Sequence, residues 1–373
     1  MSEEKTQVIH EDLNRSLQER HIQLIALGGA IGVGLFLGSA SAIEKAGPGV
    51  VLAYIIAGIA IFFVMRALGE LTVEYPVSGS FSAHAYQVLS PLAGYVSGWN
   101  YWYVWVVTCM AEITAVGVYV HLWLPDLPQW ISCLVALGLM TCANLFSVKA
   151  YGEFEFWFAL IKVVTIIFLI FTGVGMIVFG LGNGGIPVGI SNLTAHGGFL
   201  PHGIGGVFDT MLMVLFAYVG IEIIGVTAGE AADPEKNLSA AIDKVLYRIL
   251  LFYVLALLII MSIYPWDQLG HQGSPFVMVF EKLGITAAGH VINFVVITAA
   301  LSSCNSGIYS TGRMLYNLSL QGKAPKMFSA VSSNKVPYKA LGVSVVFMLI
   351  GVVLNYFLPA TVFEIIASVS AFA

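Results

Sequence analysis

The sequence predicts an all-α protein that crosses a membrane many times. Hydrophobic residues make up 58% of its 373 residues and charged residues only 10%, whereas a soluble globular chain averages about 25% charged residues. Apolar runs long enough for a membrane helix, which takes about 20 residues, follow one another along nearly the whole chain. Lysine and arginine are concentrated in alternate connections between these runs, an asymmetry typical of membrane helices.

Ten apolar segments are expected to span the bilayer. The first nine cover roughly residues 22–42, 49–69, 92–121, 129–148, 156–181, 206–229, 245–265, 286–312 and 341–358. A tenth begins near Thr361 and runs to Ala373 without a polar flank, so we expect it to be truncated. The predicted organisation is a hydrophilic cytosolic tail over residues 1–20 and one C-terminally incomplete transmembrane domain over residues 21–373.

The distribution of basic residues orients these segments. With the N-terminus in the cytosol and one crossing per segment, the outer face receives only Lys45 and Lys282. Lys162 falls inside the fifth segment, and every other lysine and arginine faces the cytosol. We therefore expect a multi-pass protein of the cell membrane, inner or plasma, with a cytosolic N-terminus and the lipid bilayer around it.

Several other protein classes find no support in the sequence. The four cysteines lie within apolar runs and are expected to pack in the core, and the histidines have no mutual ligand spacing. The sequence shows neither a phosphate-binding loop nor a nucleophile paired with a base. We expect no metal, no cofactor, no nucleic acid partner and no enzymatic reaction, and no oligomeric state is predicted.

The first apolar segment is unusually rich in glycine. Its stretch ALGGAIGVGLFLGSA, residues 26–40, contains five glycines, although each glycine weakens a helix interior by about 1 kcal/mol relative to alanine. In hydrocarbon an unpaired backbone group costs several kcal/mol, so a broken helix survives only beside a cavity or a ligand. The freed N–H groups and carbonyls would suit a zwitterion. Close helix packing by small residues is the open alternative.

The sixth apolar segment, five spans later, also contains glycines that weaken a helix. The sixth segment reads VLFAYVGIEIIGVTAGE and carries Gly220, Gly225 and the acid Glu222. Transporters are often built from inverted repeats whose interrupted helices occupy matching positions. Segments one and six match if each repeat holds five helices, which favours broken helices in both.

Several long stretches of this sequence match a known family of membrane proteins. They are RHIQLIALGGAIGVGLFLGS, AGPGVVLAYIIAG, YGEFEFWFALIKV, FAYVGIEIIGVTAGEAADPEKNLSAAI and INFVVITAALSSCNSGIYSTGRMLY. With these residues the chain resembles the amino acid permeases of the amino acid–polyamine–organocation superfamily, above all bacterial permeases for proline, histidine, threonine or alanine and glycine. The resemblance implies a five-plus-five inverted repeat of the leucine-transporter type, in a family that usually has twelve spans.

The resemblance also implies where a substrate would bind. Its carboxylate would meet N–H groups of the first interruption, and its ammonium would meet carbonyls of both. The expected substrate-binding residues are Ala30, Ile31, Gly32, Val33, Gly34, Phe216, Ala217, Tyr218 and Gly220. Many family members have a hydroxyl residue where this chain has Val33, so that side chain offers the carboxylate no help. Tyr218 would act as a gate or pack between helices, and both interpretations stay open.

Three charged residues fall inside predicted membrane segments, namely Glu112, Lys162 and Glu222, where a charge costs roughly 2.5–3.5 kcal/mol on insertion scales. The resemblance places Lys162 against spans one and eight, where sodium binds in sodium-coupled relatives, and implies that Lys162 carries the coupling proton. Because Lys162 is expected within a turn or two of the cytosolic end, snorkelling to the interface is the alternative. Glu222 would move protons or accept hydrogen bonds from the freed N–H groups.

Further polar residues receive supporting roles. The resemblance places Glu112 near the pocket wall, and Ser302 and Ser303 would direct hydroxyls toward Lys162, with helix packing as the alternative for each. Glu230 would form an inner-gate ion pair with a basic residue of another loop, or a solvated surface pair of little energetic value.

These observations predict a secondary active transporter that imports a small neutral amino acid by proton symport. The resemblance implies alternating access, in which spans one, two, six and seven rock against spans three, four, eight and nine. Two alternatives are an amino acid exchanger of the same fold and a non-transporting amino acid sensor. The expected partners are the amino acid and protons, and the sequence does not specify which amino acid is carried.

Overall fold

The computed structural model describes residues 17, 21, 24, 31–75, 79–146, 148–227, 230, 247, 249–269, 274–284 and 287–372. Within these ranges the chain forms helices joined by turns and contains no β-strand. Seven helical runs in the described part are long and apolar enough to cross a membrane: Gly38–Glu74, Pro91–His121, Gln129–Phe146, Tyr151–Phe179, Gly203–Thr227, Gly289–Leu320 and Tyr338–Phe357. This confirms the predicted all-α membrane protein.

The helices around the two expected interruptions are short, and the longest helices lie elsewhere in the chain. The first half of the described chain contains α2 (Val33–Phe36), α3 (Gly38–Ala46), η1 (Gly47–Gly49), α4 (Val50–Glu74), α5 (Ser80–Val88), α6 (Pro91–His121), α7 (Gln129–Phe146) and α8 (Val148–Phe179). The second half contains α9 (Asn192–Ala195), α10 (Gly203–Asp209), α11 (Met211–Tyr218), α12 (Ile223–Thr227), η3 (Ile249–Leu255), α15 (Ala256–Ile263), α16 (Trp266–Leu269), α17 (Pro275–Lys282), α18 (Ala288–Leu320), η4 (Lys326–Ser329), α19 (Tyr338–Phe357) and α20 (Val362–Phe372).

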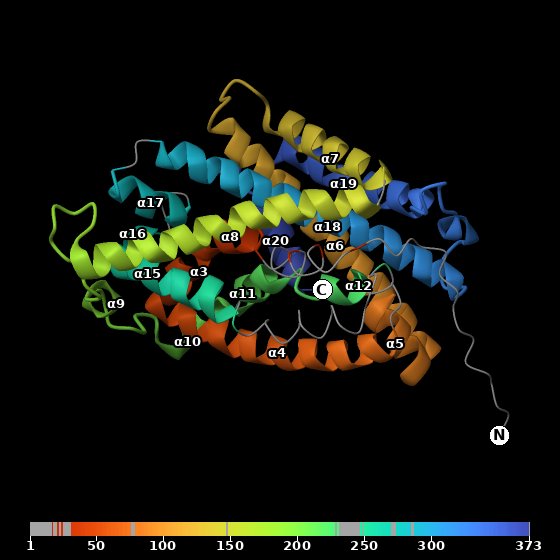
Figure 1. Ribbon diagram of the computed structural model, residues 1–373, viewed down its shortest axis with the longest axis horizontal. Coiled ribbons are helices and arrows are strands. Elements are labelled where there is room, and N and C mark those ends of the chain that lie inside the picture. Colours follow the sequence, from red (N-terminus) through yellow and green to blue (C-terminus); the bar gives the residue numbers. More distant parts are fainter. Residues whose placement is uncertain are drawn as a thin grey trace.

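Two long helices, α6 and α18, form the centre of the molecule. They pack along each other and against α7 and α19, while α4 lies along the opposite edge (Figure 1). Of the apolar windows of these spans, 78% of α6 and 83% of α18 are buried inside the protein, against 28% of α8. Polar side chains on α6 and α18 therefore face other protein groups, the usual setting for polar residues at membrane depth.

The sixth span is interrupted as predicted. Helix α11 ends at Tyr218, residues 219–222 form turns, and α12 begins at Ile223. Gly220 has φ of +111°, which only glycine adopts without strain.

The described part of the first span also contains a non-helical stretch. Ile31 and Gly32 precede α2, and Gly32 is extended, with φ −108° and ψ −166°. A second irregularity at Leu37 separates α2 from α3. The N-terminal part of this span, except for His21 and Leu24, lies outside the described residues.

Two helices, α8 and α18, extend well beyond their predicted ends, and each extension includes a charged residue. Helix α8 begins at Val148, before the expected start at residue 156, and α18 continues to Leu320, past the expected end at 312. Glu155 and Arg313 therefore lie inside helices and not in connections. Cys142 also departs from the prediction, because it is exposed on α7 while Cys109, Cys133 and Cys304 are buried.

Candidate functional site

A cluster of polar side chains lies inside the apolar core, where α6, α8 and α18 meet beside the first interruption. Its members are Glu112 on α6, Glu155 and Lys162 on α8, and Ser302 and Ser303 on α18. Each is at most 3% exposed, and Lys162, Glu155 and Ser302 are wholly buried. We call these five residues the core cluster. Buried charges are stable only when they are paired and hydrogen-bonded, so the contacts within the cluster decide what it can do.

Lys162 is held by a chain of two hydrogen bonds. Its ammonium donates to Ser302 Oγ at 2.9 Å, and the Ser302 hydroxyl donates to Glu155 Oε1 at 2.5 Å. Lys162 lies about four turns from the first residue of α8, farther than the one or two turns expected. The interior contact and complete burial contradict the snorkelling alternative for Lys162.

Glu155 is a member of the core cluster that was missed from the sequence. The fifth span was predicted to start at residue 156, which left this acid in a connection. A signal was present, because positions seven apart lie two turns apart on one helix face, and Glu155 precedes Lys162 by that spacing. An acid and a lysine so placed on an apolar helix indicate a buried pair.

Glu112 faces the backbone of the first interruption. A Cβ atom built on Gly32 would lie 3.0 Å from Glu112 Oε1 and 3.6 Å from Ser303 Oγ, so a side chain there would crowd the Glu112 carboxyl group. The carboxyl group of Glu112 also interacts with the Val33 backbone and electrostatically with Lys162. Its other oxygen, Oε2, is buried without a hydrogen-bond partner, which marks a place where a proton or a polar ligand would be stabilised.

The glycines of the first span serve two different purposes. A Cβ on Gly34 would lie 2.6 Å from Ala217 Cα, and one on Gly38 would lie 2.9 Å from Met213 Sδ. The packing interpretation therefore holds for Gly34 and Gly38, which let the first span approach α11. Gly32 instead opens the main chain toward the core cluster. Ala30, predicted to offer a carbonyl, lies outside the described residues.

Substituting Gly34 with alanine is expected to lower the free energy of unfolding by about 1–3 kcal/mol, because the new methyl group overlaps backbone atoms of Ala217 that cannot rotate away. The thermal unfolding midpoint in detergent measures the effect. Gly138→Ala on α7 is the matched control, because a Cβ there meets no atom within 4 Å. Equal midpoints for the two variants would contradict close packing at Gly34.

The second interruption is stabilised by Glu222. Its Oε2 accepts a hydrogen bond from the Gly220 N–H at 2.9 Å, and its Oε1 accepts one from the Trp105 indole at 3.1 Å. Glu222 thus satisfies an N–H group that the break releases, as one of the two predicted roles requires.

Tyr218 packs between aromatic neighbours at the end of α11. Its hydroxyl donates to the Tyr54 carbonyl at 2.8 Å, and its ring centre lies 4.8 Å from that of Tyr253 and 5.8 Å from that of Tyr54. Tyr253 in turn donates to the Ala217 carbonyl at 2.9 Å. These contacts support the interpretation that Tyr218 packs between helices. Phe216 is buried on the same helix.

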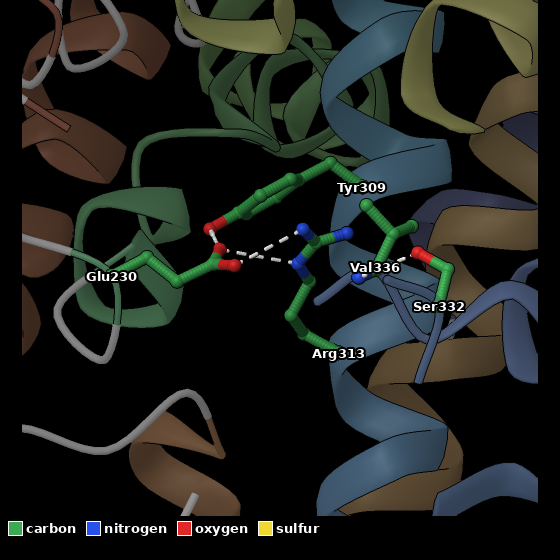
Figure 2. A network of polar contacts seen from close by, with 5 residues as sticks. All are labelled: Glu230, Tyr309, Arg313, Ser332 and Val336. Carbon is green, nitrogen blue, oxygen red and sulfur yellow. Dashed lines mark hydrogen bonds and ion pairs between the residues drawn. The ribbon is translucent and has the colours of Figure 1, made fainter. Parts of the chain in front are cut away.

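A second buried charge pair joins Glu230 to α18 (Figure 2). Arg313 Nε donates to Glu230 Oε2 at 3.2 Å and Arg313 Nη2 donates to Oε1 at 3.1 Å. The Tyr309 hydroxyl also donates to Glu230, and the Arg313 guanidinium lies 3.8 Å from the centre of the Tyr309 ring. Glu230 and Arg313 are 0% and 1% exposed. We call this group the Glu230–Arg313 pair.

The Glu230–Arg313 pair corrects one prediction. Two alternatives were predicted for Glu230: an ion pair with a basic residue of another loop, or a solvated ion pair on the surface. The partner instead belongs to α18 and the pair is buried, because Tyr309 and the guanidinium together cover the carboxylate. Beside it, in the segment before α19, the Val336 N–H donates to Ser332 Oγ at 3.3 Å.

A membrane helix that is broken in mid-span, together with a buried charged cluster inside a multi-pass helical protein, is typical of membrane transporters. The chain belongs to the amino acid permease family, whose family model matches residues 21–373. The uncharacterized amino acid permease YtnA of Bacillus subtilis is 59% identical over 362 residues, which cover 97% of this chain and 78% of that protein.

Two further relatives carry names that specify substrates. The probable threonine/serine transporter YbxG of Bacillus subtilis is 53% identical over 361 residues, covering 97% of this chain and 78% of that protein. The aromatic amino acid transport protein AroP of Escherichia coli is 47% identical over 356 residues, covering 95% of this chain and 78% of that protein. The chain is therefore an amino acid transporter of a multi-pass membrane family.

Proposed function

We propose that this permease imports a small neutral amino acid together with a proton. The observation that carries the proposal is the core cluster, in which a wholly buried lysine interacts with two buried acids, one of which, Glu112, faces the main chain at Gly32. The relative named for threonine and serine is 53% identical and the one named for aromatic amino acids 47%. Because the more similar of these two relatives is named for the small amino acids threonine and serine, the comparison supports a small substrate.

The substrate would bind across the two interruptions. Its carboxylate would accept hydrogen bonds from N–H groups at Ile31, Gly32, Val33 and Gly34, where the start of α2 adds partial positive charge. Its ammonium would meet carbonyls at Phe216, Ala217 and Tyr218, close to the turn at Gly220. The Ala217 carbonyl has one lone pair left after its bond from Tyr253.

Proton coupling would arise from Lys162 and Glu112. Two carboxylates close together cannot both remain charged in a buried site, so a substrate carboxylate at Gly32 favours a proton on Glu112. Lys162 donates to the kind of hydroxyl that a sodium ion would coordinate, and burial lets an ammonium release its proton. The contacts of Glu222 support a role in shaping the break over a role in proton transfer.

The helices form two packed groups, an arrangement that supports alternating access. Helices α6, α7, α18 and α19 pack on one another as one body, and α2, α3, α4 and α11 contact one another around the interruptions. We propose that the second group moves against the first in a five-plus-five inverted repeat, with the N-terminus in the cytosol of a cell-membrane protein.

Uptake by the full-length permease in proteoliposomes tests the proposal. We expect an inward proton gradient to drive accumulation of one or a few small neutral amino acids from a panel of twenty, and a protonophore to abolish it. Uptake that requires amino acid on the opposite side and ignores the gradient would establish the exchanger. Binding without uptake or counterflow would establish the sensor.

A further inference from the structure

The core cluster contains one charged group that has no role in the mechanism proposed above, the carboxyl group of Glu155. It is wholly buried on α8 and accepts the Ser302 hydroxyl at 2.5 Å. Its second oxygen, Oε2, is buried without a hydrogen-bond partner. A carboxylate with a free buried oxygen is costly as a purely structural group, since burial of an incompletely paired charge destabilises a protein.

The adjacent acid on the same helix is different. Glu153 lies two residues earlier, is 34% exposed and forms an ion pair with His21 at 3.2 Å. The contrast shows that burial of Glu155 is a property of its position and is not shared by the other acid in this part of α8.

We propose that Glu155 is the inner proton acceptor of Lys162, with the Ser302 hydroxyl as the relay between them. This inference rests on the proton symport proposed above. In the transfer, Ser302 Oγ takes a proton from the Lys162 ammonium and passes its own hydroxyl proton to Glu155 Oε1. The ammonium becomes an amine, the carboxylate becomes a carboxylic acid, and the serine hydroxyl is restored. The two hydrogen bonds already point in the required directions.

The core cluster is electrically neutral when Lys162 is charged and one of its two carboxyl groups carries a proton. One ammonium on Lys162 neutralises one carboxylate, so the other carboxyl group must be protonated to keep the buried cluster neutral. That proton has two possible positions, Glu112 beside Gly32 and Glu155, which the Ser302 hydroxyl joins to Lys162. Both acids interact electrostatically with Lys162. Transfer through Lys162 therefore moves a proton from the acid beside Gly32 to Glu155.

Polar groups continue from Glu155 toward the Glu230–Arg313 pair. Ser306 and Asn305 of α18 lie beside the Glu155 carboxyl group. The Tyr151 hydroxyl, one turn before Glu155, lies 3.3 Å from Ser306 Oγ, and the Tyr151 ring stacks on Tyr309 at 4.1 Å. Tyr309 donates to Glu230, so these contacts connect Glu155 to the second charge pair.

The test compares Glu155→Gln with Glu153→Gln in the full-length permease reconstituted in proteoliposomes. Two rates are measured, uptake driven by a proton gradient and counterflow exchange without a gradient. We expect Glu155→Gln to reduce gradient-driven uptake by about 100-fold, because glutamine accepts no proton, while counterflow persists. Glu153→Gln should change neither rate, and Glu155→Asp should restore part of the gradient-driven uptake.

The outcomes separate this inference from the proposed function. A wild-type protein without gradient-driven uptake would defeat proton symport itself. If the wild type is proton-coupled and Glu155→Gln is unimpaired, only the role of Glu155 is overturned. The same conclusion follows if a folded Glu155→Gln variant loses gradient-driven uptake and counterflow to the same extent. If Glu155→Gln does not fold, Ser302→Ala decides, because it removes the relay without leaving a new charge. It should lose gradient-driven uptake and keep counterflow, and any other result contradicts the inference.

Discussion

Replacing Lys162 with alanine is expected to abolish accumulation of amino acid driven by a proton gradient, a loss of about 100-fold or more. The change removes the ammonium that donates to Ser302 and that interacts electrostatically with both buried acids. Exchange across the membrane without a gradient should persist, since no predicted substrate contact is lost. Gradient-driven uptake and counterflow in proteoliposomes, measured on the same preparation, give the two rates.

The control for this prediction lies on the same helix. Lys149 is exposed at the start of α8, so Lys149→Ala removes an equal charge without touching the core cluster and should leave both rates unchanged. Glu112 and Glu155 can become neutral once the cation is gone, because a buried carboxyl group without a partner takes up a proton. Lys162→Ala should therefore fold. Accumulation that survives in this variant would refute proton carriage by Lys162.

Removing Arg313 is expected to have the largest effect on stability. Arg313→Ala leaves the Glu230 carboxylate buried without its bidentate partner, and breaking a buried pair in this way costs about 3–5 kcal/mol. The stacked guanidinium over Tyr309 is lost as well. We expect a clear fall in the thermal unfolding midpoint in detergent and a loss of uptake.

An exposed pair on α4 provides the comparison. Arg66 and Glu70 lie 3.2 Å apart with side chains 54% and 70% exposed, so Arg66→Ala should cost less than about 1 kcal/mol. Combining Arg313→Gln with Glu230→Gln removes both charges and should recover most of the stability lost in Arg313→Ala. If the gate interpretation is right, this double variant folds but transports poorly. Equal midpoints for Arg313→Ala and Arg66→Ala would show that the Glu230–Arg313 pair is solvated.

Much of the site was predictable because buried charges are rare. Lys162, Glu112 and Glu222 stood out inside apolar runs, and the structure places Lys162 and Glu112 together and Glu222 at the break in the sixth span. Gly220 was predicted at that break and has the backbone conformation that requires glycine. Ser302 was expected near Lys162 and accepts its hydrogen bond.

The residues that were missed share one physical cause. Hydropathy ends a membrane segment at the first charge, yet a charge that faces other protein groups does not end a helix. Glu155 and Arg313 both lie beyond an expected segment end and both are buried, one against Ser302 and the other against Glu230. Only the contacts across helices show that these positions belong to the interior.

The sequence by itself determined the membrane class, the position of most spans, the break at Gly220 and the family, because hydrophobicity, charge and glycine act along the chain. The tertiary structure alone decided which glycines pack and which expose the main chain, which acid shares a hydroxyl with Lys162, and that Glu230 joins Arg313 in the interior. Those outcomes depend on distances between helices that lie far apart in sequence, and no local pattern records such distances.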